Sequence, residues 1–198
     1  MMDFAVKRPV VRLALAILLM LNFLSIVTPE RTALADSIDY SVVSLGTLGG
    51  SYSATSFVNN FGQVVGISSP ANANYYHGFL WTPNNPNAAA GMMVDLGTLG
   101  GSTSNAEAIN GTGQVVGVSL FANSSFPQAF LWNPTSANST TGSMVSLGTL
   151  GGIESEAFGI NDSGQVVGDA QIDLSAFDAD IFHAFLWTPA SPNDTTGA

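Results

Sequence analysis

The sequence contains no cysteine and, beyond residue 31, no lysine or arginine. The absence of cysteine excludes disulfide bonds, thiolate chemistry and a lipid anchor attached through a thiol. Nucleic-acid binding requires cationic side chains that neutralise phosphates, and anionic membrane surfaces attract the same side chains. We therefore expect the chain beyond residue 31 to bind neither nucleic acid nor a membrane surface.

The N-terminal segment has the pattern of an export signal. Cationic residues precede an almost wholly apolar stretch over residues 13–27, which is short for a membrane span. Ala33-Leu34-Ala35 follows, with the small-x-small pattern that signal peptidase accepts. We therefore predict a signal peptide over residues 1–35, cleaved after Ala35, and a secreted, extracellular protein that uses the general secretory route. An uncleaved N-terminal anchor is the alternative.

The hexapeptide Leu-Gly-Thr-Leu-Gly-Gly occurs three times in the rest of the chain. Its copies begin 51 residues apart, a period in the range of propeller blades and other stacked units. Each copy is followed by Asn-x-x-Gly-Gln-Val-Val-Gly and then by Phe-Leu-Trp. The period divides the mature chain into repeat units over residues 36–92, 93–143 and 144–198, and we interpret the third as truncated at a unit boundary. The signature positions are Leu45, Gly49, Gly50, Gly62, Gln63 and Trp81 in the first unit, Leu96, Gly100, Gly101, Gly113, Gln114 and Trp132 in the second, and Leu147, Gly151, Gly152, Gly164, Gln165, His183, Phe185 and Trp187 in the third.

Each repeat unit contains four short strand candidates separated by turn residues. In the third unit they cover residues 144–150, 156–160, 165–169 and 182–187, and helix-period patterns are absent from the mature chain. Asn at the first position and Gly at the fourth position of Asn-x-x-Gly suit a type I turn. We therefore predict a β-hairpin between the second and third strands of every unit.

These strands carry apolar residues on both faces. Adjacent valines in Gln-Val-Val-Gly point to opposite sides of a sheet, and Phe-Leu-Trp places its aromatic pair opposite its leucine. Burial on both sides is what face-to-face stacking of sheets produces. We therefore predict an all-β fold of three tandem four-stranded units in an incomplete propeller-like array, with a β-trefoil as the alternative. The end faces would expose valines and aromatic pairs, so we predict self-association if only three units exist.

The three linked motifs resemble those of the HAF repeat family of extracellular bacterial proteins. The resemblance covers roughly residues 40 to 198, and the literal His-Ala-Phe is His183-Ala184-Phe185 in the third unit. The equivalent first residues are His77 in the first unit and Gln128 in the second. This resemblance implies export, repetition and a propeller-like blade, and no defined activity. A fainter similarity to kelch blades depends on the Gly-Gly doublet and the later Trp.

Histidine and serine recur at fixed places in the repeat, but neither pattern predicts catalysis. His77 and His183 each begin an aromatic strand, and no second titratable group recurs beside them as a general base requires. Ser53, Ser104 and Ser155 lack the Gly-x-Ser-x-Gly context of a nucleophile, and serine before a strand usually bonds the backbone. The glycines of the hexapeptide lack the lysine and helix of a phosphate-binding loop and favour close backbone packing. We predict no catalytic and no cofactor-binding residue.

The segment before the third Phe-Leu-Trp strand contains an insertion and carries the densest group of acidic residues. The acids there are Asp169, Asp173, Asp178 and Asp180. Carboxylates bind calcium, which is available outside cells, so these four residues are the candidate metal ligands. Their spacing does not match the twelve-residue calcium loop. A solvated acidic loop is the alternative.

Export, repetition and polar connecting loops together favour a binding function. We expect an extracellular module that binds a protein, a glycan or a surface, without catalysis and with calcium as its one candidate cofactor. A secreted, glycan-directed hydrolase with the repeats as its scaffold is the alternative. Glycosidic bonds are hydrolysed by two carboxyl groups that face each other across the substrate, so acids gathered in one pocket would favour the hydrolase.

Overall fold

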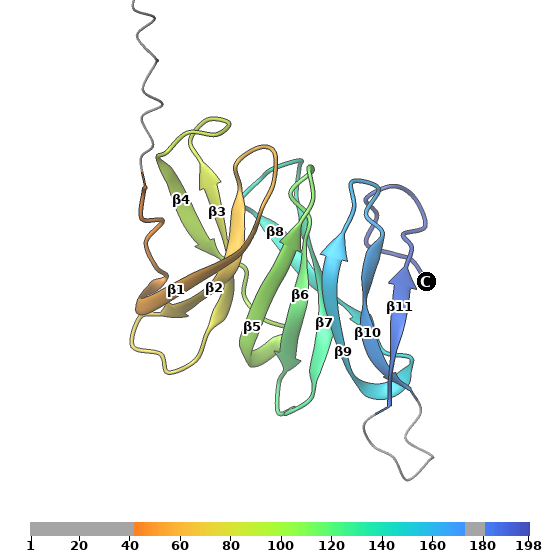
Figure 1. The fold of residues 1–198 in the computed structure, drawn as a ribbon. Helices are drawn as coiled ribbons and strands as arrows, with labels where there is room; N and C mark the ends of the chain where they lie inside the picture. The colour runs from red at the N-terminus through yellow and green to blue at the C-terminus, as the bar shows by residue number, and fades with distance from the viewer. Residues whose placement is uncertain (1–41, 173–180) are drawn as a thin grey trace, which may run out of the picture. The chain divides into compact units, whose positions relative to one another are not determined.

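The computed structural model describes residues 42–172 and 181–198 of the chain. The predicted cleavage site at Ala33 and Ala35 lies outside these residues, as do Asp173, Asp178 and Asp180. The described residues form strands and turns and no helix, and hence no helix of a length and apolarity to cross a membrane. Their strands make three antiparallel sheets, none of them closed (Figure 1). The predicted all-β class is confirmed.

Within each sheet, strands that follow one another in the chain are hydrogen-bonded neighbours. The first sheet contains β1 (Gly49–Val58), β2 (Val64–Pro70), β3 (His77–Pro83) and β4 (Gly91–Asp95). The second contains β5 (Gly100–Ile109), β6 (Val115–Phe121), β7 (Pro127–Pro134) and β8 (Gly142–Gly148). The third contains β9 (Gly151–Ile160), β10 (Val166–Ile172) and β11 (Phe182–Trp187).

The strand predicted over residues 144–150 to open the third unit lies in the second sheet. It is β8, and it pairs with β7 so that Met144 lies opposite Trp132. Each sheet begins instead near the Gly-Gly doublet of the hexapeptide, so the sheets are offset from the predicted repeat units. A repeating sequence sets the length of the repeat and leaves its starting point open, because the partner of each strand is decided only when the strands pair.

The turn between the first two strands of each sheet has the predicted geometry. In the first sheet the Gly62 amide donates to the Asn59 carbonyl at 3.0 Å, and the Asn59 amide donates to the Gln63 carbonyl at 3.0 Å. Gly62 has a φ of 87°, and Gly113 and Gly164 share this left-handed conformation, which glycine adopts without steric cost. The hairpin predicted from Asn-x-x-Gly is therefore confirmed in all three sheets.

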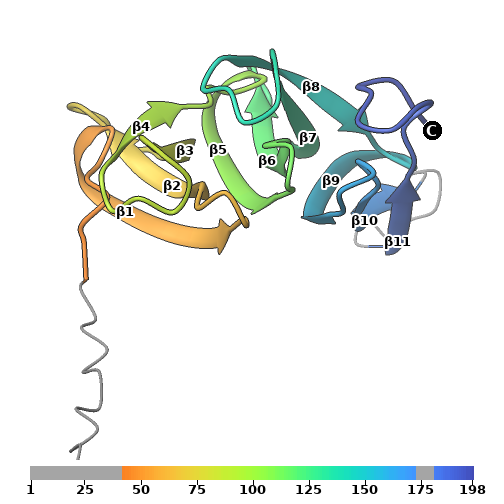
Figure 2. The same cartoon turned by 90° about the horizontal axis from the view of Figure 1, so that it is seen from above.

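The first strand of each later sheet packs across the sheet before it. β5 contacts β1, β2 and β3, and β9 contacts β5, β6 and β7 (Figure 2). Two apolar cores result, one at each boundary between sheets. The first contains Val65, Leu80, Ile109 and Trp132, and the second contains Val116, Leu131, Val166 and Trp187. The middle sheet thus buries both of its faces, as the two-sided pattern of its strands predicts.

The aromatic pair of the first sheet does not form the exposed end face that the sequence predicts. Phe79 and Trp81 are both buried. The indole of Trp81 lies against Gly91 of β4, where an added Cβ would be 2.5 Å from the ring atom Cζ2. The neighbouring strand therefore covers the ring edge. Of the paired valines, Val65 is buried in the first boundary and Val64 is half-buried, whereas Val167 of the third sheet is half exposed.

Candidate functional site

The recurring serines bond backbone groups, as predicted. Ser104 Oγ donates to the Gly97 carbonyl at 2.6 Å and accepts from the Gly78 amide of the preceding sheet at 2.9 Å. Ser155 repeats both bonds one unit later. Ser53 makes the donated bond, to the carbonyl of Gly46 just before β1. The hydroxyls of Ser104 and Ser155 therefore join one sheet to the next, which indicates a structural role.

A carboxylate that the sequence did not predict lies beside His77. His77 Nδ1 and Asp95 Oδ2 are 2.8 Å apart, across β3 and β4. The equivalent pair in the second sheet is Gln128 and Ser146, whose hydroxyl donates to Gln128 Oε1 at 2.8 Å. The bond recurs with side chains that do not titrate near neutral pH, so it indicates strand pairing and not general-base chemistry. His77 and Asp95 fell in different predicted units, which is why the pair was missed, and His183 is exposed on β11.

The asparagines of the hairpin turns form a chain of hydrogen bonds through the three sheets. Asn59 Nδ2 donates to Gln63 Oε1 at 3.0 Å and to the Asn110 carbonyl of the second sheet at 2.9 Å. One unit later, Asn110 Nδ2 donates to Gln114 Oε1 at 2.9 Å and to the Asn161 carbonyl of the third sheet at 3.1 Å. The sequence predicted only a turn for these asparagines. The structure adds a bond to the next sheet.

The signature glutamines make a second set of bonds between sheets. Gln63 Nε2 donates to the Asn138 carbonyl at 3.3 Å, and Gln114 Nε2 donates to the Asn193 carbonyl at 3.0 Å. Asn138 and Asn193 lie in the loops after the Phe-Leu-Trp strands and, like Asn87, have positive φ. These asparagines follow the repeat, and their spacing is the sequence signal that was overlooked. Because both glutamines are buried, the bonds satisfy amide groups that water does not reach.

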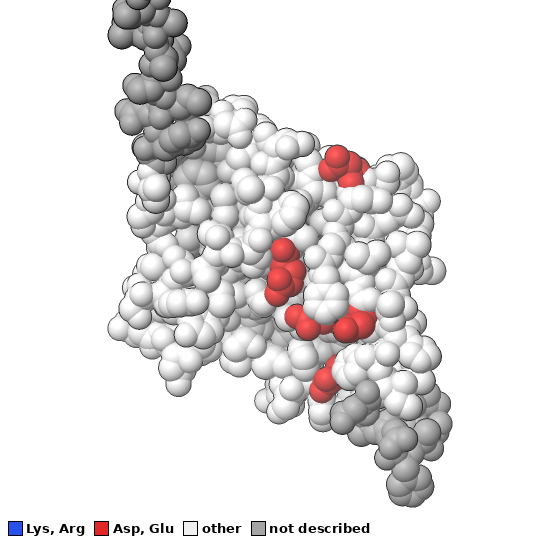
Figure 3. Space-filling view, in the orientation of Figure 1, with Lys and Arg blue, Asp and Glu red and all other residues white. Residues whose placement is uncertain are grey.

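Acidic side chains gather at the boundary between the second and third sheets. A pocket there has a volume of about 250 Å³ and is lined by Pro127, Glu154, Ser155, Glu156, Asp169 and Phe182. Glu156 lies opposite Asp169 on the paired strands β9 and β10. Burial, and then the negative charges of Glu107 and Asp169, raise the pKa of Glu156 above its usual value. Among the described residues no lysine or arginine offsets this charge (Figure 3).

Of the four predicted calcium ligands, Asp169 alone lies in the described part of the chain. Within residues 42–172 and 181–198, no three histidine, aspartate or glutamate side chains are grouped as a metal ion requires. Asp169 shares its pocket with Glu154 and Glu156. Calcium binding by the four aspartates stays a prediction.

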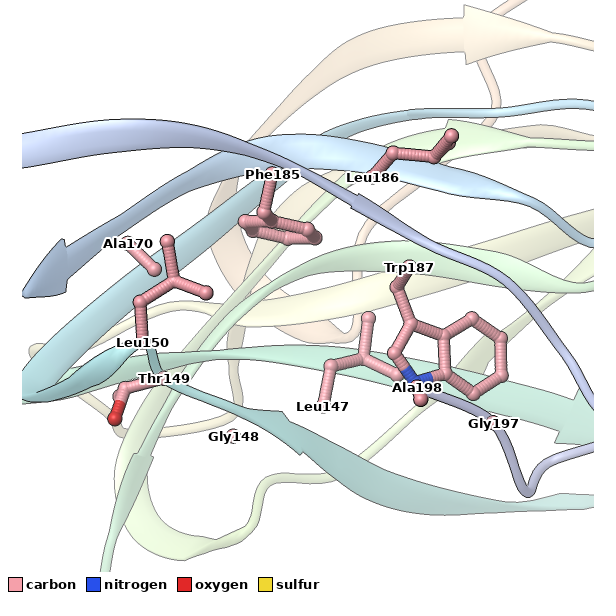
Figure 4. Close-up of a pocket in the computed structure, with 10 residues that line it drawn as sticks. All are labelled: Leu147, Gly148, Thr149, Leu150, Ala170, Phe185, Leu186, Trp187, Gly197 and Ala198. Atoms are coloured by element: carbon pink, nitrogen blue, oxygen red, sulfur yellow. The ribbon is translucent and has the colours of Figure 1, made fainter.

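A second pocket, of about 220 Å³, lies beside β11 (Figure 4). Its side chains are mainly apolar and include Leu147, Leu150, Phe185, Leu186 and Trp187. Thr149 supplies a hydroxyl, and the lining contains no acid or base. This pocket can accept an apolar group and lacks a side chain that could transfer a proton.

Comparison of the chain with protein-family models, with curated proteins and with solved structures finds no match in any of the three. Function therefore has to be argued from the chain's own residues. The recurring serines, asparagines and glutamines form hydrogen bonds that join one sheet to the next. The acidic pocket is left as the site whose carboxylates could bind a ligand.

Proposed function

We propose that this chain is a secreted extracellular binding module built as a propeller-like array of sheets. The observation that carries the proposal is the commitment of the recurring polar side chains to bonds between sheets. Ser104, Asn110 and Gln114 each bond a backbone group of a neighbouring sheet. A rigid repeated scaffold with variable loops is typical of repeat proteins that bind through their surface. The resemblance to HAF repeat proteins, which implies export and repetition but no defined activity, supports the extracellular repeat architecture in this proposal.

The acidic pocket between the second and third sheets is the ligand site in this proposal. The carboxylates of Glu154, Glu156 and Asp169 accept hydrogen bonds from hydroxyl or amino groups, and Phe182 offers a partly exposed apolar ring. A surface that carries acids without cations repels acidic polymers. The ligand class that fits these groups is a neutral or amino-bearing glycan.

A glycan-directed hydrolase is the second candidate function, and one observation favours it. Many glycosidases use paired carboxyl groups, of which one has a raised pKa and donates a proton to the leaving oxygen. Glu156, with its raised pKa, lies opposite Asp169 in the same pocket. In this second function Glu156 would be the general acid, and Asp169 would be the base or nucleophile.

One experiment on the exported chain separates binding from hydrolysis. Chitosan, chitin and galacturonate oligosaccharides, which are cationic, neutral and acidic, are titrated by calorimetry, and the same mixtures are assayed for new reducing ends. Affinity that falls in this order, without new reducing ends, supports the binding module. Sustained release of reducing ends that is lost in Glu156→Gln establishes the hydrolase instead. Absence of binding to all three glycans refutes the proposed ligand class.

Matched variants locate the binding site. Phe182→Ala should weaken the binding of every glycan that binds, whereas Glu156→Gln should weaken that of the cationic glycan most. Asp162→Asn is the control, because it removes one charge from a hairpin turn and keeps an oxygen that can accept from the Gly111 amide. Affinity should be nearly unchanged in this control. An equal loss in Asp162→Asn and Glu156→Gln would indicate a general effect of charge and contradict a localised site.

A further inference from the structure

The two boundaries between sheets are built from the same contacts. The Gly78 amide donates to Ser104 Oγ at the first boundary, and the Ala129 amide donates to Ser155 Oγ at the second, both at 2.9 Å. At each boundary an asparagine and a glutamine of one sheet also donate to carbonyls contributed by the next repeat. A valine and a leucine of the earlier sheet are fully buried there. Each boundary therefore joins two different faces, one from the earlier and one from the later sheet.

The outer face of the third sheet corresponds to the faces that the first two sheets bury against the sheet that follows them. In the third sheet this face is uncovered among the described residues. Val167 and Leu186 are 49% and 60% exposed, whereas their equivalents in the first two sheets are fully buried. Asn161 Nδ2 keeps its local bond to Gln165 Oε1. Gln165 Nε2 has no hydrogen-bond partner among the described residues, although both equivalent glutamines donate across a boundary. This face consists of apolar side chains and donors.

The outer face of the first sheet corresponds to the faces that the second and third sheets bury against the sheet before them. Val58 is 57% exposed, whereas Ile109, its equivalent in the second sheet, is 2% exposed and lies in the first core. Ser53 Oγ holds its local bond but, within the described residues, accepts none from a preceding strand, unlike the serines at the two boundaries. The carbonyl of Asn87 is equivalent to the carbonyls of Asn138 and Asn193, each of which accepts a hydrogen bond from a glutamine of the preceding sheet. This face consists of an apolar side chain and acceptors.

We propose that the outer face of the third sheet binds the outer face of the first sheet in a second copy of this chain. The contact would repeat the two internal boundaries, with the exposed leucine and valine of one face packed on Val58 of the other. The Ala184 amide would donate to Ser53 Oγ, and Gln165 Nε2 would donate to the Asn87 carbonyl. The chain already joins these two kinds of face twice, which is why a second copy is the occupant that fits. The inference stands independently of the proposed glycan ligand.

The pairing is head-to-tail and not between identical faces. Two copies of the third-sheet face would bring donors against donors, which would bury unpaired amide groups. A head-to-tail contact either closes into a ring or extends into a filament. The described residues of two copies hold six sheets, which is within the range of about four to eight at which propellers close. A closed dimer is therefore the expected product.

Two variants that each disable one face test the assembly. Size-exclusion chromatography with light scattering on the exported chain should show a dimer, and Leu186→Lys or Val58→Lys alone should each give a monomer. Mixing these two variants leaves one intact face on each, so a one-to-one dimer should form again. Phe126→Lys is the control, an exposed apolar residue in the loop before β7, and should assemble as the unaltered chain does. An unaltered chain that is monomeric at every concentration, or a mixture that stays monomeric, overturns the proposal.

A disulfide supplies a measurement that does not depend on disrupting the surface. The chain has no cysteine, so introduced thiols have no competing partner. An added Cβ on Gly78 would be 3.5 Å from Ser104 Oγ, so side chains at the equivalent positions of the new contact would lie close enough to test as a disulfide pair. A double variant, Ser53→Cys with Ala184→Cys, should form covalent dimers on oxidation, whereas each single variant should not form this head-to-tail link. Absence of cross-linked dimers in the double variant, or equal cross-linking of Ala184→Cys alone, contradicts the head-to-tail contact.

Discussion

Alanine variants of Asn110 and Asn161 would measure how much the bonds between sheets contribute to stability. Each closes its own hairpin in the same way, because Oδ1 accepts from two turn amides and Nδ2 donates to the glutamine that follows. Asn110 Nδ2 also contacts the Asn161 carbonyl at 3.1 Å and Asn193 Oδ1 at 3.3 Å. Asn110 is buried, whereas Asn161 is exposed. Asn110→Ala therefore removes the same local bonds as Asn161→Ala and, in addition, a bond from the Thr112 hydroxyl at 2.9 Å and the contacts with the next repeat.

The difference between the two variants can be estimated from these contacts. A hydrogen bond contributes about 0.5–1.5 kcal/mol net, and a buried polar group left without a partner costs about 1–3 kcal/mol. The turn amides freed by Asn161→Ala can bond water, so this variant should lose about 1 kcal/mol. Asn110→Ala loses bonds to the third repeat and leaves the buried Gln114 side chain with one partner fewer. We expect Asn110→Ala to lower the free energy of unfolding by about 2–4 kcal/mol more than Asn161→Ala does.

The assay is urea unfolding followed by tryptophan fluorescence. Both substitutions are introduced into the Leu186→Lys variant, so that association of two copies does not bury Asn161. Equal slopes of free energy against urea concentration would show that the unfolding reaction is unchanged in extent. Equal destabilisation by Asn110→Ala and Asn161→Ala would refute the conclusion that these side chains stabilise the contact between sheets.

Three further predictions concern packing, charge and metal. Gly142→Ala should lower stability by about 1–3 kcal/mol because its new Cβ would clash with the Asn133 carbonyl oxygen and lie 2.5 Å from Trp132 Cζ2, and an unchanged melting temperature would show that the strand and the ring move aside freely. Glu156→Gln should raise the melting temperature at neutral pH: the raised pKa of Glu156 means that the native state holds its proton more tightly than the unfolded chain, so native stability falls as pH rises through the folded pKa. The two melting curves should converge below pH 4.5, the ordinary pKa of this carboxyl, and a gap of the same size in acid would contradict the assignment. Millimolar calcium should raise the melting temperature of residues 36–198 by mass action, less so in Asp169→Asn, and identical melting with calcium and with chelator would refute calcium binding.

Local and periodic signals in the sequence determined the class of the fold and its smallest parts. The Asn-x-x-Gly pattern predicted the turn at Asn59 to Gly62 correctly, because the φ of a glycine and the bonds of a type I turn depend on adjacent residues. The paired valines predicted burial on both faces, and Val115 and Val116 are both fully buried in the middle sheet. These features need no knowledge of which strand lies beside which.

The tertiary structure alone decided which residues meet. A periodic sequence has no marked origin, so β8 was predicted to open the third unit and in fact completes the second sheet, and His77 was separated from Asp95 for the same reason. The bonds of Asn59 and Gln63 to the second repeat also came from the packing of sheets. A side-chain amide that suits a turn can equally suit a carbonyl of a neighbouring sheet. Whether it reaches that carbonyl depends on the distance between two strands far apart in the chain, which local sequence does not set.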